Sequence, residues 1–281
     1  MMRRFLACFA AMVTLSAGAN AQKTGAAAPV SALTYADLAD LATAAPITAE
    51  LRIRKAKKLN GETAINVLST HQRFLIEADV TALIRGDAAL PPRISYLYDA
   101  PRGSDGKLPK LVKAGVIVFA APVTGRPTQV QLIARDAQIS AIPADQLRVR
   151  SILADATAPD APPRVTGAGN AFHVAGTLSG EGETQIFLSS REGRPMSFNI
   201  VRAPDSRPSW SVSVGEIVDA AAPVPVRDSF LWYRLACFLP RTLPASSVID
   251  ATVQDAAIIA EDYRTVMAGL GPCPRNRIKP R

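Results

Sequence analysis

The chain has 281 residues and a formal net charge of +8, which is a mild basic excess for this length. Such an excess alone gives little support to a nucleic-acid partner. Two His and three Cys are too few for a zinc site built from those ligands, so we expect neither a metal nor another cofactor.

The first 21 residues predict a secretory signal peptide. Arg3 and Arg4 form a charged start, an apolar run extends from Phe5 to Leu15, and Ala19-Asn20-Ala21 is a small-x-small cleavage site. The run is about half as long as the ~20 residues that span a bilayer core. We therefore expect cleavage after Ala21, export to the periplasm and no transmembrane anchor in the mature form. Cleavage removes two arginines and lowers the net charge from +8 to +6.

Residues 22–33 are small and without a period, which is typical of a disordered lead-in. Thr34 and Asp37 form a pair resembling a capping box and predict a helix that Pro46 ends. From Ile47 onward the period changes to the alternation of strands, with no helix-length amphipathic segment between them, which favours a small barrel or sandwich. Five strands are predicted around Leu51–Ile53, Phe74–Ile84, Ile94–Tyr98, Val116–Ala120 and Val130–Ile133.

The strand pattern of residues 47–139 resembles the OB-like barrels of netrin-type and metalloproteinase-inhibitor domains. The likeness rests on a first strand with a basic tail, a long strand ending in Leu83-Ile84-Arg85-Gly86, and the apolar strand Gly115-Val116-Ile117-Val118-Phe119. The chain lacks the cysteines that staple those domains. The resemblance therefore implies a fold, and no inhibitory residue carries over.

The second half of the chain predicts a helix, a linker, four strands and two final helices. The helix covers Pro143–Thr157, with Leu147, Ile152 and Leu153 as its apolar side, and Pro159–Pro163 is the linker. The strands are predicted at Phe172–Leu178, Gln185–Leu188, Ser197–Arg202 and Trp210–Val214. The last two helices are expected at Ser229–Leu239, capped by Asp228, and from Asp250 to Ala268, with an apolar stripe of Val253, Ala257, Ile258, Ala260 and Val266.

Two cysteines, Cys237 and Cys273, remain after signal cleavage. In an oxidising compartment such a pair is expected to form a disulfide. The domain boundaries that we predict are 34–157 for a helix plus OB-like barrel and 164–281 for a β-rich domain with a C-terminal helical pair.

The layout also resembles an uncharacterised family of exported alphaproteobacterial proteins, which implies export and domain layout but no activity. The strings that carry this resemblance are Tyr35-Ala36-Asp37-Leu38-Ala39-Asp40-Leu41, Ala161-Pro162-Pro163, Gly182-Glu183-Thr184-Gln185-Ile186-Phe187-Leu188, Trp232-Tyr233-Arg234-Leu235-Ala236-Cys237-Phe238-Leu239-Pro240 and Gly271-Pro272-Cys273.

No residue pattern in the sequence indicates a catalytic centre. A hydrolase triad would need His71 or His173 as its base, and neither lies in a nucleophile-elbow motif. His173 beside Glu181 or Glu183 is the best available pair. These two acidic residues lie in a glycine-rich turn, which lacks the ligand ladder of a calcium loop and is interpreted as a hairpin turn.

One region combines arginine with aromatic side chains, a composition frequent in binding surfaces. The alternative interpretation is that the two tryptophans anchor the core. The residues of this predicted surface are Arg194, Arg202, Arg207, Trp210, Trp232 and Tyr233. A second candidate is the basic stretch from Arg52 to Lys58, interpreted as a solvated strand edge or as a contact for an anionic lipid or glycan.

The fold class that we predict is α+β, with an N-terminal five-stranded OB-like β-barrel followed by a second β-rich part with two C-terminal helices. The leading functional hypothesis is a non-catalytic periplasmic binding module for an envelope protein or glycan. The alternative is an envelope hydrolase with an unrecognised site. Nucleic-acid binding through Tyr96 and Tyr98 is disfavoured, because the chain is expected to leave the cytoplasm.

Overall fold

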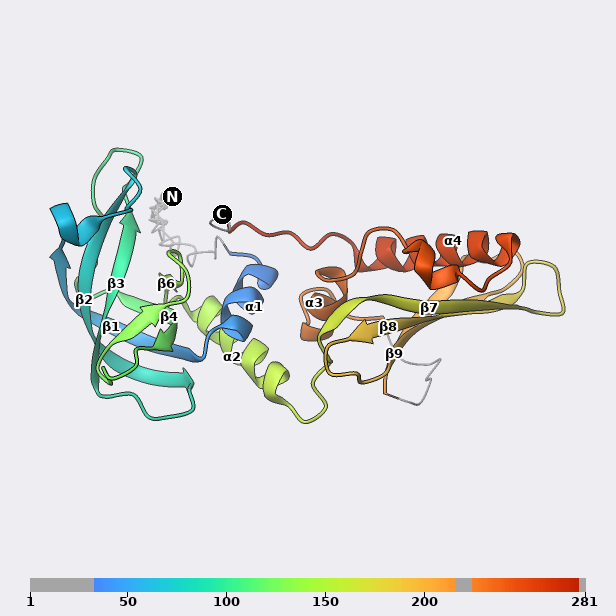
Figure 1. Ribbon diagram of the computed structural model, residues 1–281, viewed down its shortest axis with the longest axis horizontal. Helices are drawn as coiled ribbons and strands as arrows, with labels where there is room; N and C mark the ends of the chain where they lie inside the picture. Colours follow the sequence, from blue (N-terminus) through green and yellow to red (C-terminus); the bar gives the residue numbers. More distant parts are fainter. Residues whose placement is uncertain (1–32, 216–223, 278–281) are drawn as a thin grey trace, which may run out of the picture. The chain divides into compact units, whose positions relative to one another are not determined.

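The computed structural model describes residues 33–215 and 224–277 (Figure 1). The predicted signal peptide and most of the lead-in lie outside the described residues. Within those residues the fold is α+β, with two antiparallel sheets and four α-helices. The helices are α1 (Tyr35–Ala44), α2 (Pro143–Thr157), α3 (Phe230–Ala236) and α4 (Val253–Leu270), with 3-10 turns η1 (Gly61–Ala64) and η2 (Ala245–Val248).

Helix α1 begins as its sequence predicts. The Thr34 hydroxyl accepts a hydrogen bond from the Asp37 backbone N–H at 3.1 Å, and the Asp37 carboxylate accepts one from the Thr34 N–H at 3.0 Å. This reciprocal capping satisfies two donors that a helix start otherwise leaves unpaired. Leu38 and Leu41 are fully buried, as are most residues of the helix, so α1 is held in the core on more than one side.

The first sheet has the strand order β3-β2-β1-β4-β5, with β6 also paired to β4. The alternation expected for these strands is present, because Phe74, Ile76 and Ala78 are buried while their neighbours in sequence are less so. The strands are β1 (Ile47–Lys58), β2 (His71–Arg85), β3 (Arg93–Pro101), β4 (Gly115–Pro122), β5 (Val130–Leu132) and β6 (Gln138–Ser140).

The expected closure of these strands into a barrel is not confirmed. Between β3 and β5 the described residues show one parallel bridge, Ser95 to Gln129, with the Ser95 N–H donating to the Thr128 carbonyl at 2.9 Å. Strand β5 has three residues, which pair in a ladder with β4 and not with β3. The sheet is therefore open in its hydrogen bonding, although its two outer strands meet at one point.

Helix α2 has the predicted bounds but a different buried face. Val149, Ile152 and Leu153 are buried, whereas Leu147, predicted on the apolar side, is 70% exposed. At 3.6 residues per turn, position 147 points nearly opposite to position 149, so both cannot face the core. The prediction for Leu147 was wrong because apolar character alone does not define the face of a helix.

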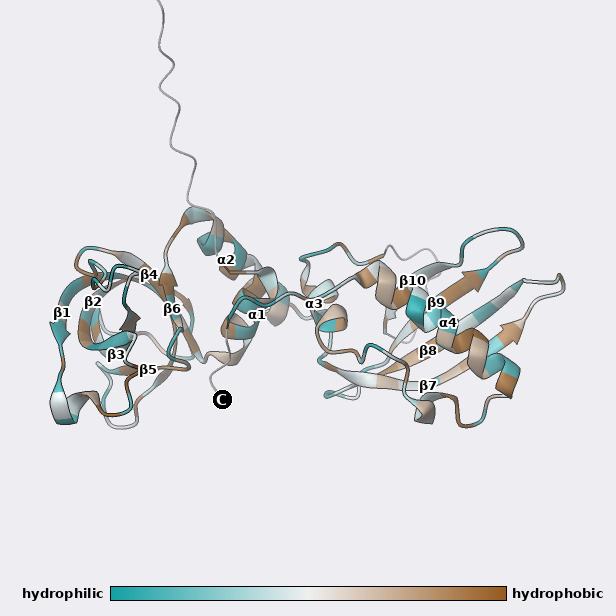
Figure 2. Cartoon of the chain, turned by 90° about the horizontal axis from the view of Figure 1, so that it is seen from above, coloured by the Kyte–Doolittle hydropathy of each residue, from teal (hydrophilic) through white to brown (hydrophobic). Residues whose placement is uncertain are grey.

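The second sheet has the order β10-β9-β8-β7, and α4 packs on one of its faces. Ile186 and Phe198 of the sheet join Ile259 and Tyr263 of the helix in one buried cluster. Hydrophobic colour is present along the strands of both sheets in Figure 2. The strands are β7 (Val165–Ala175), β8 (Gly182–Ser190), β9 (Met196–Arg202) and β10 (Ser209–Val214).

The caps of the last two helices differ from the prediction. Ser229 rather than Asp228 caps α3, with its hydroxyl accepting from the Trp232 N–H at 3.1 Å. Thr252 rather than Asp250 caps α4 by the same contact to Asp255. In each case a serine or threonine next to the helix is the N-cap, whereas the prediction had placed the N-cap at an aspartate one or two residues earlier.

The buried face of α4 is also displaced from the predicted stripe. Val253 is 92% exposed, and Ile259 rather than Ile258 is buried. Ile259, Tyr263, Val266 and Leu270 repeat at three- and four-residue steps, the spacing of one helix face. The predicted stripe was right at Val266 but wrong at Val253 and Ile258, and it left out Tyr263 while counting small alanines.

Candidate functional site

A groove of about 690 Å³ lies between β3 and β5. We call it the β3–β5 groove. It is lined by Arg73, Leu75, Ser95, Tyr96, Leu97, Asp99, Val123, Arg126, Gln129, Val130, Gln131, Leu132, Ala134 and Arg135.

The alternation of β2 and β3 brings the side chains of one wall of this groove together. Arg73 lies opposite Asp99 and Leu75 opposite Leu97 in the register of the two strands. These positions share the face opposite to the buried Phe74 and Tyr96. The wall is therefore apolar around Leu75 and Leu97, the latter 50% exposed, and charged at one end.

The charges at that end neutralise each other. The Arg73 Nε and Nη2 atoms donate to the two Asp99 carboxylate oxygens at 2.7 and 2.8 Å. These hydrogen bonds raise the pKa of Arg73, against a smaller opposing effect of burial. Arg73 and Asp99 thus form a fixed, bidentate pair that shapes the groove and leaves no free charge for a ligand.

Two other guanidinium groups in the groove have no carboxylate partner. Arg126 donates to the Gln129 side chain at 3.2 Å, and Arg135 donates to the Asn66 carbonyl at 3.2 Å. Neither arginine is in an ion pair with any residue of 33–215 or 224–277. The β3–β5 groove therefore carries uncompensated positive charge over apolar side chains.

The two tyrosines considered for stacking on nucleic-acid bases lie differently. Tyr96 is 3% exposed, and its hydroxyl donates to the Gln138 side chain at 2.8 Å. Burial raises the pKa of Tyr96 and of Tyr98, so both phenols stay neutral. Tyr96 contributes to the core behind the groove rather than an open ring on which a base could stack.

The basic stretch of β1 is partly paired. Arg54 lies 3.1 Å from Asp79, and Lys55 lies 3.3 Å from Glu77. Arg52 donates to the Lys113 carbonyl at 3.1 Å. These exposed pairs contribute little to stability, but they reduce the free charge that this strand presents.

The predicted arginine and aromatic surface is divided between core and solvent. Trp232 and Tyr233 are 1% and 2% exposed, which agrees with the alternative that they anchor the core. Trp232 donates its indole N–H to the Leu270 carbonyl at 2.7 Å. Trp210 is half-buried against Phe198. The arginines differ: Arg194 donates to the Ala161 carbonyl, Arg202 is held by acidic residues of α4, and Arg207 is exposed.

A buried polar chain that the sequence did not indicate joins the second sheet to α4. Arg202 Nε donates to one Asp262 oxygen at 2.8 Å, and the Thr184 hydroxyl donates to the other at 2.5 Å. His173 Nδ1 lies 2.9 Å from the same hydroxyl. Thr184 and Asp262 are fully buried. The partner of His173 is therefore Thr184 rather than Glu181 or Glu183. Because the Thr184 hydroxyl is fully buried, a substrate cannot reach it as a nucleophile.

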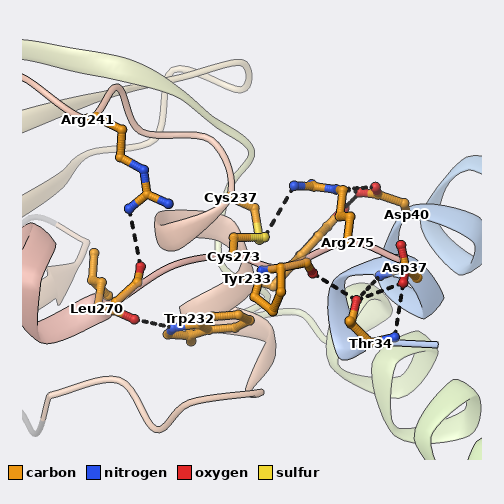
Figure 3. Close-up of a disulfide and its surroundings, with 12 residues drawn as sticks. Thr34, Asp37, Asp40, Trp232, Tyr233, Cys237, Arg241, Leu270, Cys273 and Arg275 are labelled. Atoms are coloured by element: carbon orange, nitrogen blue, oxygen red, sulfur yellow. Dashed lines mark hydrogen bonds and ion pairs between the residues drawn. A yellow bond between two sulfur atoms is a disulfide. The ribbon is translucent and has the colours of Figure 1, made fainter. Parts of the chain in front are cut away.

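The predicted disulfide joins Cys237 to Cys273, with 5.2 Å between their Cα atoms. It holds the start of a C-terminal tail that runs along α1 (Figure 3). Arg275 of this tail donates twice to the Asp40 carboxylate, at 2.7 and 3.2 Å, and the Tyr233 hydroxyl donates to the same group at 2.8 Å. The disulfide and these hydrogen bonds fix the tail against α1.

Asp37 of α1 is a second anchor for the tail. Its carboxylate, buried in full, accepts hydrogen bonds from the backbone N–H groups of Asn276 at 2.9 Å and Arg277 at 3.2 Å. Arg277 also forms a bidentate pair with Asp136 at 2.7 Å. Asp37, which takes part in the cap of α1, thus also positions the end of the described chain.

Comparison with known proteins adds no family or function. Neither the protein-family models nor the curated proteins include a match to the chain. Among the described residues, no group of three or more His, Cys, Asp and Glu could hold a metal ion. No helix in the same ranges is long and apolar enough to cross a membrane.

Proposed function

We propose that the protein is an exported, non-catalytic binding module of the periplasm and that the β3–β5 groove takes an acidic ligand. The observation that carries this proposal is the pair Arg126 and Arg135, two guanidinium groups without a carboxylate partner among the described residues, in a groove of about 690 Å³. Such groups bind carboxylates and phosphates in a fixed geometry.

The architecture of the first sheet supports a binding role. We propose that β1 to β5 form an OB-like barrel in the order β1-β2-β3-β5-β4, with the Ser95 bridge as the point where β3 meets β5. OB barrels bind extended ligands across their second and third strands and the loop between the fourth and fifth. The β3–β5 groove lies over these same elements, with Arg126 in that loop.

Binding measurements on the mature chain test the ligand class. Calorimetric titration with an oligogalacturonate, a carboxylated oligosaccharide, and with an acidic peptide is expected to show binding that weakens with salt. A neutral oligosaccharide of the same length should not bind. The double variant Arg126→Gln/Arg135→Gln should weaken binding by roughly tenfold or more, whereas Arg148→Gln, an exposed arginine of α2, should leave it unchanged.

The results that would overturn the proposal are equally specific. If no acidic probe binds at millimolar concentration, or if the double variant Arg126→Gln/Arg135→Gln binds like the wild type, the groove is not an acidic-ligand site. The export part is tested separately by N-terminal sequencing of protein from the envelope fraction. Mature protein should begin at Gln22, and reduced, full-length chain recovered only from the cytoplasm would contradict it.

A further inference from the structure

We propose that the ligand of the β3–β5 groove is an extended polypeptide segment that pairs as an added strand with the free edge of β3. This inference rests on the proposed function, since it concerns the same groove. It names the chemistry of the partner: a stretch in which acidic and apolar residues alternate.

The backbone of β3 has an edge that faces the groove. Ser95 donates its N–H to Thr128, away from β2. In an antiparallel pair the residues that face the partner strand alternate with those that face away. Because Leu97 and Asp99 lie two and four positions after Ser95 in an unbroken register, their N–H and C=O groups also face away from β2. Among the described residues, β3 forms a ladder with β2 alone, and its one bridge to the β5 side is at Ser95, so neither Leu97 nor Asp99 is in a second ladder.

The opposite wall also has backbone groups that face away from the strand beside it. Ile133 donates its N–H to the Phe119 carbonyl at 3.1 Å, which places Ile133 in hydrogen-bonding contact with β4. By alternation, the backbone groups of Leu132 and Val130 face away from β4. Both residues line the β3–β5 groove. A strand entering the groove would therefore meet backbone donors and acceptors that match the alternating N–H and C=O groups of an extended polypeptide.

The side chains determine the composition of such a strand. Its residues would alternate between the two faces, as in any strand. Leu75, Leu97 and Leu132 provide apolar contacts in the groove, and Arg126 and Arg135 provide positive charge. An alternating acidic and apolar sequence matches both, whereas a basic sequence would place like charges together.

The test uses the mature chain and a capped peptide of about seven residues alternating Glu and Val, which is the length of a typical strand. The control peptides replace Glu by Lys, or carry N-methyl groups on alternate amides. The N-methylated peptide keeps the charge and removes the backbone donors. We expect the Glu–Val peptide to bind, the Lys–Val peptide not to bind, and the N-methylated peptide to bind roughly fivefold to tenfold more weakly.

Hydrogen exchange gives a site-specific readout. Saturating Glu–Val peptide should slow the exchange of the Leu97 and Asp99 amides, and it should leave the amides of α4 unaffected. The variant Leu97→Pro removes one groove-facing N–H at a position that does not bond to β2. It should weaken the peptide several-fold more than the control Leu97→Ala, which keeps that N–H.

The outcomes separate this inference from the proposed function. Equal binding of the N-methylated and unmodified peptides, or no added protection at Leu97 and Asp99, overturns strand pairing. Binding of the oligogalacturonate without binding of the peptide overturns it as well and leaves the acidic-ligand site standing. Failure of all acidic probes overturns both proposals. If Leu97→Pro does not fold, the N-methylated peptide on the wild-type chain still decides.

Discussion

Removal of the disulfide should lower the free energy of unfolding by an amount that follows from the length of its loop. Cys237 and Cys273 are 36 positions apart. Closing a loop of that length removes conformational entropy from the unfolded chain, which corresponds to about 4 kcal/mol at 25 °C. The double variant Cys237→Ser/Cys273→Ser should lose about this amount and leaves neither disulfide partner as a free thiol.

The loss is measured by urea unfolding followed through the fluorescence of Trp232, which is buried. The wild-type chain unfolded with a reductant should lose the same amount, because reduction and substitution open the same loop. The control Arg275→Gln breaks a partly exposed ion pair of the same tail, so its loss should stay near 1 kcal/mol. A loss below about 1 kcal/mol in the double serine variant would refute the loop-entropy reasoning.

Two further perturbations test the anchoring of the tail and the face of α2. Burial alone would raise the pKa of Asp37, but hydrogen bonds from the backbone N–H groups of Asn276, Thr34 and Arg277 outweigh it and lower the pKa below its ordinary value. The stabilising effect of the ionised Asp37 is thus complete above about pH 4, and it is lost as the pH falls through the lowered pKa. The variant Asp37→Asn should lower the free energy of unfolding by about 1–3 kcal/mol at pH 7. It should also make that free energy less dependent on pH in urea unfolding measured from pH 6 to pH 2. If the stability of that variant falls at low pH as steeply as that of the wild type, other carboxylates cause the acid dependence. Ile152→Ala should lower the free energy of unfolding by about 2–5 kcal/mol, whereas Leu147→Ala on the exposed side should change it by less than about 0.5 kcal/mol. Equal losses in these two variants of α2 would contradict the buried face described above.

The candidate site was only partly predictable. The sequence indicated the strands that form the β3–β5 groove, and it singled out Tyr96 and Tyr98 on one of them. It gave no signal for Arg126 and Arg135, because both lie outside the predicted strands, in segments without a period. Listing the charged residues in the segments on either side of the short strand at Val130 could have found these two arginines.

The buried polar chain shows a similar limit. Thr184 follows the alternation of β8 and could be expected to point inward, but its acceptor Asp262 lies 78 positions later. A pairing over that distance depends on how α4 packs against the sheet. Periodicity within either segment carries no information about it.

The sequence by itself determined the local structure of this protein. The cap of α1, the alternation of β2, the bounds of α2 and the pairing of two remaining cysteines all follow from residues near one another in the chain or from their number. The tertiary structure decided which of several similar apolar residues is buried, as with Ile259 over Ile258, and which charges stay unpaired, as with Arg126 and Arg135. The physical reason is that burial and charge pairing depend on contacts between distant segments, whereas capping and alternation depend on backbone geometry within one segment.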